Sequence, residues 1–275
     1  MRPQPSILLL TVDSIANSGN HGPRQERPQT PRVRSGHELS NSNGATSKAQ
    51  PVTVTGGDTS GGRVSLAGTL LFISGVWGLL SITIAESLTP SYNVSAGTVS
   101  GLGTPYFSGV CNTLPGCAAP IQPGSAVIVI SFFLGGLFML WSGYLLRSAT
   151  GHRLFGLGVL VAGALQAVVG ASYLPLYLGA TTSGPVGAAY DLHVASAIPL
   201  FVLVIVLMIS FYRINGGPFR YFSLVLGLVA LVSFLLFASG NNLGLGLGGI
   251  ERVLIYSFEA WVIGLGAYLW QKSLE

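Results

Sequence analysis

Six apolar stretches, each near the roughly 20 residues that cross a bilayer as a helix, limit most strongly what this chain can fold into. They run roughly over 64–86, 125–146, 154–174, 190–212, 219–239 and 250–270. Backbone groups in lipid must be satisfied within their own segment, and the alternating period of a membrane barrel is absent. Only 8% of the residues are charged, against about 25% in a soluble domain. The sequence therefore predicts an all-α fold, a polytopic membrane helix bundle with six transmembrane helices.

The first 62 residues have a different composition from the rest of the chain. They are rich in Pro, Ser, Asn, Gly, Arg and Gln and show no apolar period, which is typical of disorder. We therefore expect a disordered cytoplasmic tail over 1–62 and a transmembrane domain over 63–275. An alternative is that the first residue lies upstream of the real start, since no Met occurs between Met1 and Met139. Much of the tail would then not be native.

The positions of Lys and Arg predict the orientation of the helices, because positive charge is enriched on the cytoplasmic side. Seven of the 13 basic residues lie at or before Arg63. Five more flank the second and fourth connections or follow the last helix: Arg147, Arg153, Arg213, Arg220 and Lys272. Only Arg252 falls on the other side, which gives twelve against one. We therefore expect a multi-pass protein of the cytoplasmic membrane with N-terminus and C-terminus cytoplasmic.

The longest connection, residues 87–124, is extracytoplasmic in this topology. It holds the two Cys of the chain, Cys111 and Cys117, which are candidates for a disulfide because that compartment permits one. Two free thiols are the alternative. Asn93, followed by Val94 and Ser95, forms a glycosylation sequon on the same side.

Ionisable residues in or beside the predicted helices gather toward the extracytoplasmic side. They are Glu86, Asp191, His193, Glu251, Arg252 and Glu259. Ionisable groups within a membrane are costly, usually paired, and face the interior of the bundle. The distribution predicts a polar pocket that opens to the exterior.

Helical geometry, at about 100° per residue, refines this prediction. Arg252 and Glu259 share a face but are about 10 Å apart along the axis, too far for a direct salt bridge. We expect Arg252 to meet Glu86 or Asp191 on another helix. Asp191 and His193 point about 200° apart, so they cannot both face one partner helix.

Two interpretations of these residues stay open. Arg252 and its carboxylates could form a structural clamp that holds the first, fourth and sixth helices together. The same residues could instead form a ligand, proton or catalytic site. Glu259 is either protonated and hydrogen-bonded, or it takes part in function.

Metal and cofactor chemistry lacks ligands in this sequence, so we expect no metal and no cofactor. Only His193 of the four His lies within a predicted helix, whereas a membrane haem commonly needs two His and a zinc hydrolase three. Ser172 and His193 could form a nucleophile–base pair. No oxyanion-hole signature accompanies that pair.

Several stretches carry a resemblance to a known family: LAGTLLFISG, Pro90-x-Tyr92, Ser100-x-Leu102-Gly103, HVASAIPLFV, and GGIERVLIY continuing to GLGAYL. Over residues 65–269 the chain resembles the six-helix membrane proteins of the domain-of-unknown-function 998 family, common in archaea and also found in bacteria. The most specific matches are His193 and the Gly-Gly-x-Glu-Arg run of Gly248, Gly249, Glu251 and Arg252. The chain departs at Gly101, where the family often has Asp, and at Ser257, where Pro is common. The resemblance implies a fold and no activity.

The leading hypothesis is a membrane protein without chemistry of its own, whose outward-facing pocket binds a small solute or lipid headgroup, or which stabilises an assembly. One alternative is an enzyme acting on lipid or isoprenoid substrates at the outer leaflet, with Glu259 or His193 as acid or base. Another is a proton-coupled carrier with Glu259 as the proton site. The expected partners are membrane lipids and other membrane subunits. Nucleic acid is not expected.

Overall fold

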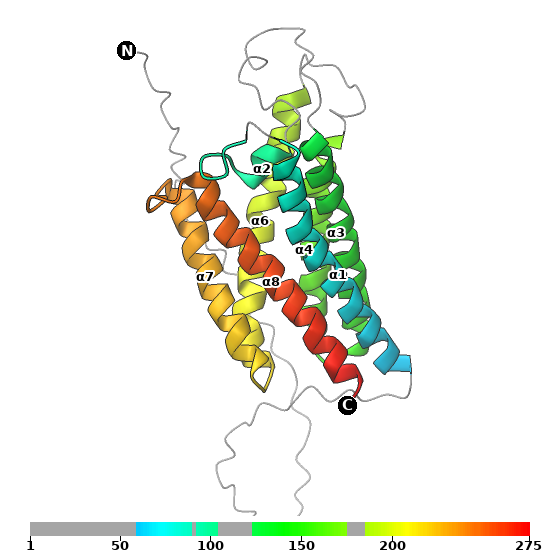
Figure 1. Cartoon of the computed structure of the whole chain (residues 1–275). Coiled ribbons are helices and arrows are strands. Elements are labelled where there is room, and N and C mark those ends of the chain that lie inside the picture. Colours follow the sequence, from blue (N-terminus) through cyan, green and yellow to red (C-terminus); the bar gives the residue numbers. More distant parts are fainter. Residues whose placement is uncertain (1–58, 90–91, 104–122, 175–184) are drawn as a thin grey trace, which may run out of the picture. The chain divides into compact units, whose positions relative to one another are not determined.

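A computed structural model describes residues 59–89, 92–103, 123–174 and 185–275. Residues 1–58 of the predicted 1–62 tail, together with Cys111 and Cys117, lie outside these residues. The described residues form helices only, in the order α1 (Thr59–Ser87), α2 (Val99–Leu102), α3 (Pro123–Ala149), α4 (Arg153–Ala171), α6 (Pro185–Ile214), α7 (Phe219–Ser239) and α8 (Leu247–Ser273) (Figure 1).

Six of these helices are long and apolar enough to cross a membrane, namely all except α2. The all-α prediction and the six predicted spans are confirmed, and the chain is a multi-pass membrane protein. Helix α1 begins at Thr59, before the predicted boundary at residue 63, and α8 begins at Leu247 rather than at residue 250. The four-residue helix α2, in the connection after α1, was not predicted.

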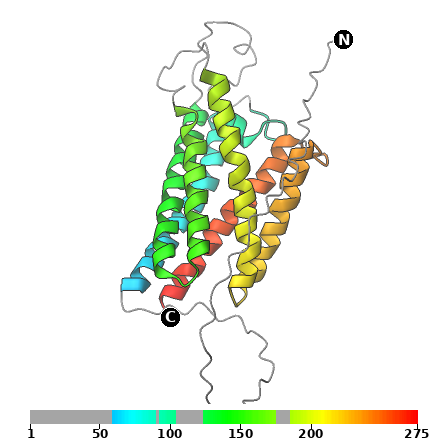
Figure 2. The same cartoon turned by 180° about the vertical axis from the view of Figure 1, so that it is seen from behind.

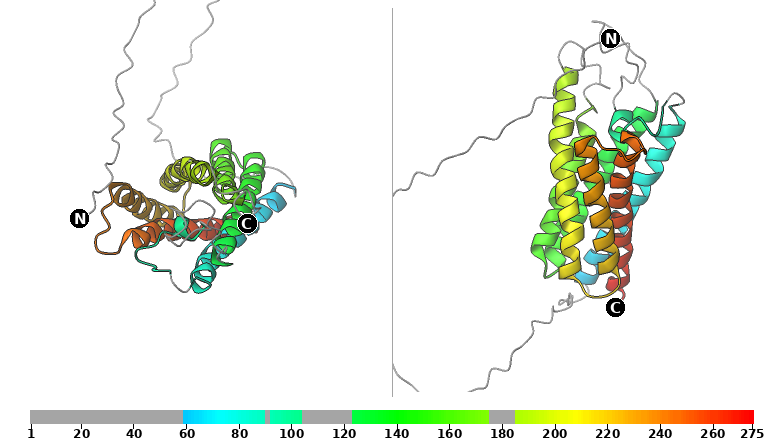
Figure 3. Two further views of the ribbon diagram at one scale, coloured as in Figure 1. Left: turned by 90° about the horizontal axis from the view of Figure 1, so that it is seen from above. Right: turned by 90° about the vertical axis from the view of Figure 1, so that its left-hand side faces the viewer.

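The long helices pack in a closed ring that follows the chain. The principal contacts join α1 to α3, α3 to α4, α4 to α6, α6 to α7, α7 to α8, and α8 back to α1. Figure 2 shows α4 beside α6, and the view down the helices in Figure 3 shows the same order. Residues 92–103, including α2, lie at the end of the bundle where α1 ends and α6 and α8 begin, which we call the α2 end (Figure 1).

Small residues allow the helices to approach closely. A Cβ atom added to Gly136 of α3 would collide with the backbone of Ala167, and one on Gly163 of α4 would collide with the backbone of Leu140. Without a hydrophobic force between helices in lipid, such close packing supplies much of the attraction between them. The Gly-rich composition therefore contributes directly to the α3–α4 contact.

A buried aromatic residue ties three helices together in the other half of the bundle. The Trp261 ring of α8 is fully buried, and its Nε1 donates a hydrogen bond of 2.7 Å to Ser223 Oγ of α7. Ser223 Oγ in turn donates to the Met208 carbonyl of α6 at 2.7 Å. These bonds satisfy polar atoms that would otherwise be costly in a buried site.

Candidate functional site

Arg252 of α8 forms an ion pair with Glu86 at the end of α1. Its Nε and Nη2 atoms both donate to Glu86 Oε1, at 2.9 and 2.6 Å. The Arg252 side chain is 6% exposed and that of Glu86 19% exposed. Of the two partners that the sequence offered for Arg252, the structure selects Glu86 and not Asp191.

Tyr92 completes the contacts of the Arg252 guanidinium. Arg252 Nη2 donates to the Tyr92 hydroxyl at 2.8 Å, and the guanidinium carbon lies 5.4 Å from the centre of the Tyr92 ring. Burial raises the pKa of the Tyr92 phenol above its usual value, although the hydrogen bond from Arg252 acts in the opposite direction. The phenol therefore stays protonated, and its single O–H proton is shared between the carbonyls of Gly97 and Thr98, at 2.5 and 2.7 Å.

The third guanidinium nitrogen of Arg252 holds backbone carbonyls. Nη1 donates to Val94 and Gly97 of the loop before α2, at 2.7 and 2.9 Å, and to Gly248 of α8 at 2.9 Å. A Cβ atom on Gly248 would collide with the Gly97 carbonyl, so only Gly lets the loop lie this close. All three guanidinium nitrogens are thus engaged within the protein.

Glu251, the neighbour of Arg252, holds α2. Its carboxylate accepts hydrogen bonds from the backbone N–H groups of Val99 and Ser100 and from the Ser100 hydroxyl. The side chain is 1% exposed, and the polar groups around it compensate its burial. The Gly-Gly-x-Glu-Arg run at the start of α8 therefore holds residues 92–103 in place through its contacts with them.

Asp191 lies apart from this network. Its side chain is exposed on α6, and no ion pair joins it to another residue in the described part of the chain. His193, two residues further on, is 3% exposed and points into the bundle. The opposite directions follow from the helical rotation between the two positions, so the structure does not bring Asp191 into the predicted pocket.

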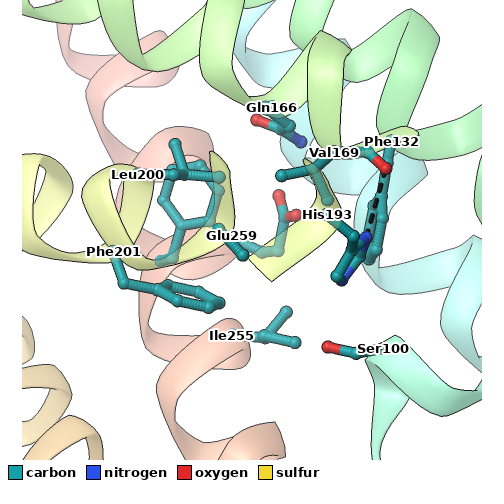
Figure 4. A pocket seen from close by; sticks show the side chains of 11 residues that line it. Ser100, Phe132, Gln166, Val169, His193, Leu200, Phe201, Ile255 and Glu259 are labelled. Atoms are coloured by element: carbon teal, nitrogen blue, oxygen red, sulfur yellow. Dashed lines mark hydrogen bonds between the residues drawn. The ribbon is translucent and has the colours of Figure 1, made fainter. Parts of the chain in front are cut away.

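A small cavity, which we call the deep cavity, lies inside the ring of helices (Figure 4). Its water-accessible volume is about 30 Å³. Glu259 of α8, His193 of α6 and Gln166 of α4 contribute its polar groups, with Ser100 at one edge. The other lining residues are Phe132, Val169, Ala197, Leu200, Phe201, Ile255 and Phe258. The deep cavity is an apolar chamber with a few convergent polar groups, as ligand sites commonly are.

Two polar side chains of the deep cavity, Glu259 and Gln166, are buried with atoms that lack a partner, whereas His193 and Ser100 are hydrogen-bonded. Glu259 is 2% exposed, and its carboxyl forms no hydrogen bond or ion pair with the described residues. Gln166 is 5% exposed, and its Oε1 atom has no hydrogen-bond partner. Gln166 was not among the residues predicted from the sequence, where its only signal is a polar side chain within an apolar span. Unpaired buried polar groups are rare enough in proteins to indicate a functional role or a bound molecule.

A second, wide cavity of about 460 Å³ adjoins the deep cavity toward α2. Ser100, His193, Ala197 and Phe201 line both cavities. Five of the other eleven lining residues are apolar and come from α6 and α7: Val194, Ile198, Phe234, Phe237 and Ala238. Gly101 and Glu251 also line the wide cavity, so the fastening of α2 shapes its wall.

The nucleophile–base pair considered for Ser172 and His193 is not formed in this structure. The Ser172 hydroxyl donates to the Val169 carbonyl at 2.7 Å, and His193 Nδ1 lies 3.3 Å from the same oxygen. Both side chains therefore bond one carbonyl and not each other. This arrangement gives Ser172 no activating base.

The remaining candidate positions are less informative. Asn93 is exposed, and its side-chain oxygen accepts hydrogen bonds from the backbone and hydroxyl of Ser95, so its glycosylation stays a prediction. Within the described ranges no group of three or more His, Cys, Asp or Glu residues could hold a metal ion. Ser257 is buried, and its hydroxyl donates to the Val253 carbonyl at 2.7 Å.

Comparison with known proteins gives one match. A family model described as "Protein of unknown function (DUF998)" matches residues 72–268, which is more than half of the 275-residue chain. No curated protein and no solved structure matches the chain. The matched range begins within α1 and ends within α8, so it includes the deep cavity and the residues that fasten α2.

Proposed function

The chain belongs to the DUF998 family, whose members are described as proteins of unknown function, and from its own geometry we propose that it binds a small solute without performing chemistry on it. The solute occupies the deep and wide cavities. The observation that carries this proposal is a cavity inside the bundle lined by two buried polar groups without partners among the described residues, the Glu259 carboxyl and Gln166 Oε1.

The separation between a structural network and the cavities supports this proposal. Arg252, Glu86 and Tyr92 are satisfied by one another and by loop carbonyls. They form a clamp between α1, α8 and the loop before α2, and this clamp does not include the fourth span that the prediction assigned to it. Glu259 and His193 stand outside that network and line the cavity instead. The residues that the sequence grouped together therefore divide into a clamp and a binding chamber.

The wide cavity is proposed to open to the exterior of the cytoplasmic membrane. The distribution of Lys and Arg supports this orientation, because the α2 end carries Arg252 alone, whereas Arg147, Arg153, Arg213, Arg220 and Lys272 lie near the opposite helix ends. Membrane lipids surround the bundle. If other membrane subunits bind this protein, we propose that they contact the lipid-facing surface of the bundle.

Side-specific labelling of an introduced thiol tests the binding proposal. In a background with Cys111→Ser and Cys117→Ser, Ala197→Cys should react with a membrane-impermeant methanethiosulfonate added to intact cells, because Ala197 lines both cavities. Ala195→Cys is the matched control on the same helix, since Ala195 is exposed on the outer surface of the ring and lines neither cavity. Absence of reaction at Ala197→Cys without added ligand, or reaction only from the cytoplasmic side, would overturn the proposal.

The carrier is a second candidate, favoured by Glu259. Its carboxyl is buried inside the bundle without a partner, as the proton site of a carrier would require. A carrier predicts uptake into proteoliposomes that depends on a pH gradient and is abolished by Glu259→Gln. Binding without uptake supports the solute-binding protein instead.

A further inference from the structure

Hydrogen-bond acceptors converge on the deep cavity from three helices. Because the Val169 carbonyl can only accept, His193 Nδ1 carries the proton of their contact, and Nε2 of the neutral ring is an acceptor. Gln166 Oε1 is a buried acceptor without a partner. The two oxygens of Glu259 add further acceptors (Figure 4). Among the described lining residues, the Ser100 hydroxyl donates to Glu251, and neither it nor the Gln166 amide N–H donates to the Glu259 carboxyl, which is left without a hydrogen-bond partner.

Positive charge is also missing from this site. The described residues that line the deep cavity include neither Lys nor Arg. Arg252 is the basic residue at the same end of the bundle, and its three guanidinium nitrogens are bonded to Glu86, Tyr92 and backbone carbonyls. An anionic group placed in the deep cavity would be buried beside an acidic side chain, with no positive charge among the described lining residues to compensate it. The site thus disfavours carboxylates and phosphates.

The size of the deep cavity limits the group that can enter it. One water molecule needs at least about 10–15 Å³ of this kind of volume, and the cavity offers about 30 Å³. It therefore holds one small group of a few atoms and not a sugar or a phosphate. An alkylammonium group has this size and carries three N–H donors. A hydroxyl has the same size but only one donor.

Aromatic and aliphatic walls surround the polar groups. Phe132, Phe201 and Phe258 line the deep cavity, and a cation over an aromatic face gains about 0.5–2 kcal/mol. The adjoining wide cavity, with its walls of Ile198 and Phe237, offers apolar surface to a hydrocarbon chain. The two cavities together suit a cationic head on a short apolar body.

We propose that the solute is a small primary alkylamine, whose ammonium group occupies the deep cavity between Glu259, Gln166 and His193 while its hydrocarbon chain lies in the wide cavity. This inference rests on the proposed solute-binding function and specifies its ligand. Glu259 serves as the counter-ion, and the bound ammonium supplies the partner that this buried carboxylate lacks.

Binding of three probes of equal chain length tests this ligand class. The purified full chain in detergent is titrated with n-pentylamine, 1-pentanol and pentanoate, and binding is followed by calorimetry and by the thermal midpoint. Pentylamine should bind and raise the midpoint. Pentanol should bind at least about tenfold more weakly than pentylamine, because charge-assisted hydrogen bonds are about twice as strong as neutral ones. Pentanoate binding as tightly as pentylamine, or no pentylamine binding, would overturn the inference.

Substitutions locate the binding in the deep cavity. Glu259→Gln keeps the shape of the side chain and should weaken pentylamine binding about tenfold or more, since it removes the counter-ion. Asp191→Asn is the matched control, because it removes a carboxylate on an exposed face of α6. Gln166→Leu should also weaken binding and provides a second variant where Glu259→Gln does not fold. Equal binding by wild type, Glu259→Gln and Gln166→Leu would place the amine elsewhere.

The outcomes separate this inference from the proposed function. Labelling of Ala197→Cys from the exterior without pentylamine binding leaves the solute-binding function standing and rejects the alkylamine. Absence of both labelling and binding rejects both. Protection of Ala197→Cys from the thiol reagent by pentylamine, and not by pentanoate, supports both together.

Discussion

Replacement of Arg252 by Ala should destabilise the bundle strongly, because this residue joins α8, α1 and the loop before α2. Its five N–H groups make two contacts to Glu86, one to Tyr92 and three to the carbonyls of Val94, Gly97 and Gly248, which share the two N–H groups of Nη1. Removal of one partner from a buried ion pair typically costs about 3–5 kcal/mol, since the other charge stays buried. The 6% and 19% exposures of the two side chains place this pair close to the buried case.

The thermal midpoint of the purified protein in detergent measures this loss. For a domain of this size, 1 kcal/mol corresponds to about 2–4 °C, so Arg252→Ala should lower the midpoint by roughly 6–20 °C. Glu86→Ala should also lower the midpoint. The double variant should lower it by less than the sum of the two single decreases, because the two residues share one interaction. Arg213→Ala, on an exposed position of α6, is the matched control and should change the midpoint little.

A normal midpoint for Arg252→Ala would refute the reasoning that makes this residue a clamp. Additive effects of Arg252→Ala and Glu86→Ala would show that the two side chains act independently. Arg252→Lys separates charge from geometry, because one ammonium cannot replace bonds that leave three guanidinium nitrogens in different directions. The thermal midpoint of Arg252→Lys should be closer to that of Arg252→Ala than to that of wild type.

Further substitutions test the surroundings of the cavity. Gly248→Ala should lower the thermal midpoint, because its Cβ would collide with the Gly97 carbonyl. Gly249→Ala should lower it less, since the added Cβ meets only the Leu245 side chain at 3.0 Å. Equal decreases for the two variants would contradict the close approach of the loop. Glu251→Gln should cost about 1.5–3 kcal/mol and accelerate amide hydrogen exchange at Val99 and Ser100, and unchanged exchange would contradict its hold on α2. Glu259→Gln should leave the thermal midpoint within about 2 °C of wild type, because no described partner is lost; a large decrease would assign this carboxyl a structural role. Burial raises the pKa of Tyr92, so the protonated phenol contributes to folding stability below the ordinary Tyr pKa of 10.0, and this contribution is lost at higher pH. The stability of Tyr92→Phe should therefore decline less between pH 9 and 11 than that of wild type.

The spans could be predicted from the sequence because hydrocarbon length fixes the length of a transmembrane helix. Rotation about the helix axis also predicted that Asp191 and His193 point in different directions, and the structure places His193 inside and Asp191 outside. The sequence could not decide whether Arg252 meets Glu86 or Asp191, since that choice depends on which helices are neighbours. The ring order, in which α1 lies beside α8, makes Glu86 the partner.

Other features carried no sequence signal. Helix α2 has four residues, too few for a periodic pattern, and it is held by Glu251 from a distant part of the chain. Gln166 became a candidate only when the fold placed it beside Glu259 and His193. Whether a buried polar group is paired depends on contacts between helices, so the division between clamp and cavity could be found only from the structure.

An experimental density map of the full chain in lipid nanodiscs, recorded with n-pentylamine, would test the central claim most directly. The account predicts density for a small group between the side chains of Gln166, His193 and Glu259, with the alkyl chain extending toward Ala197 and Phe201. Direct hydrogen bonds among Gln166, His193 and Glu259, with no space left between them, would contradict it.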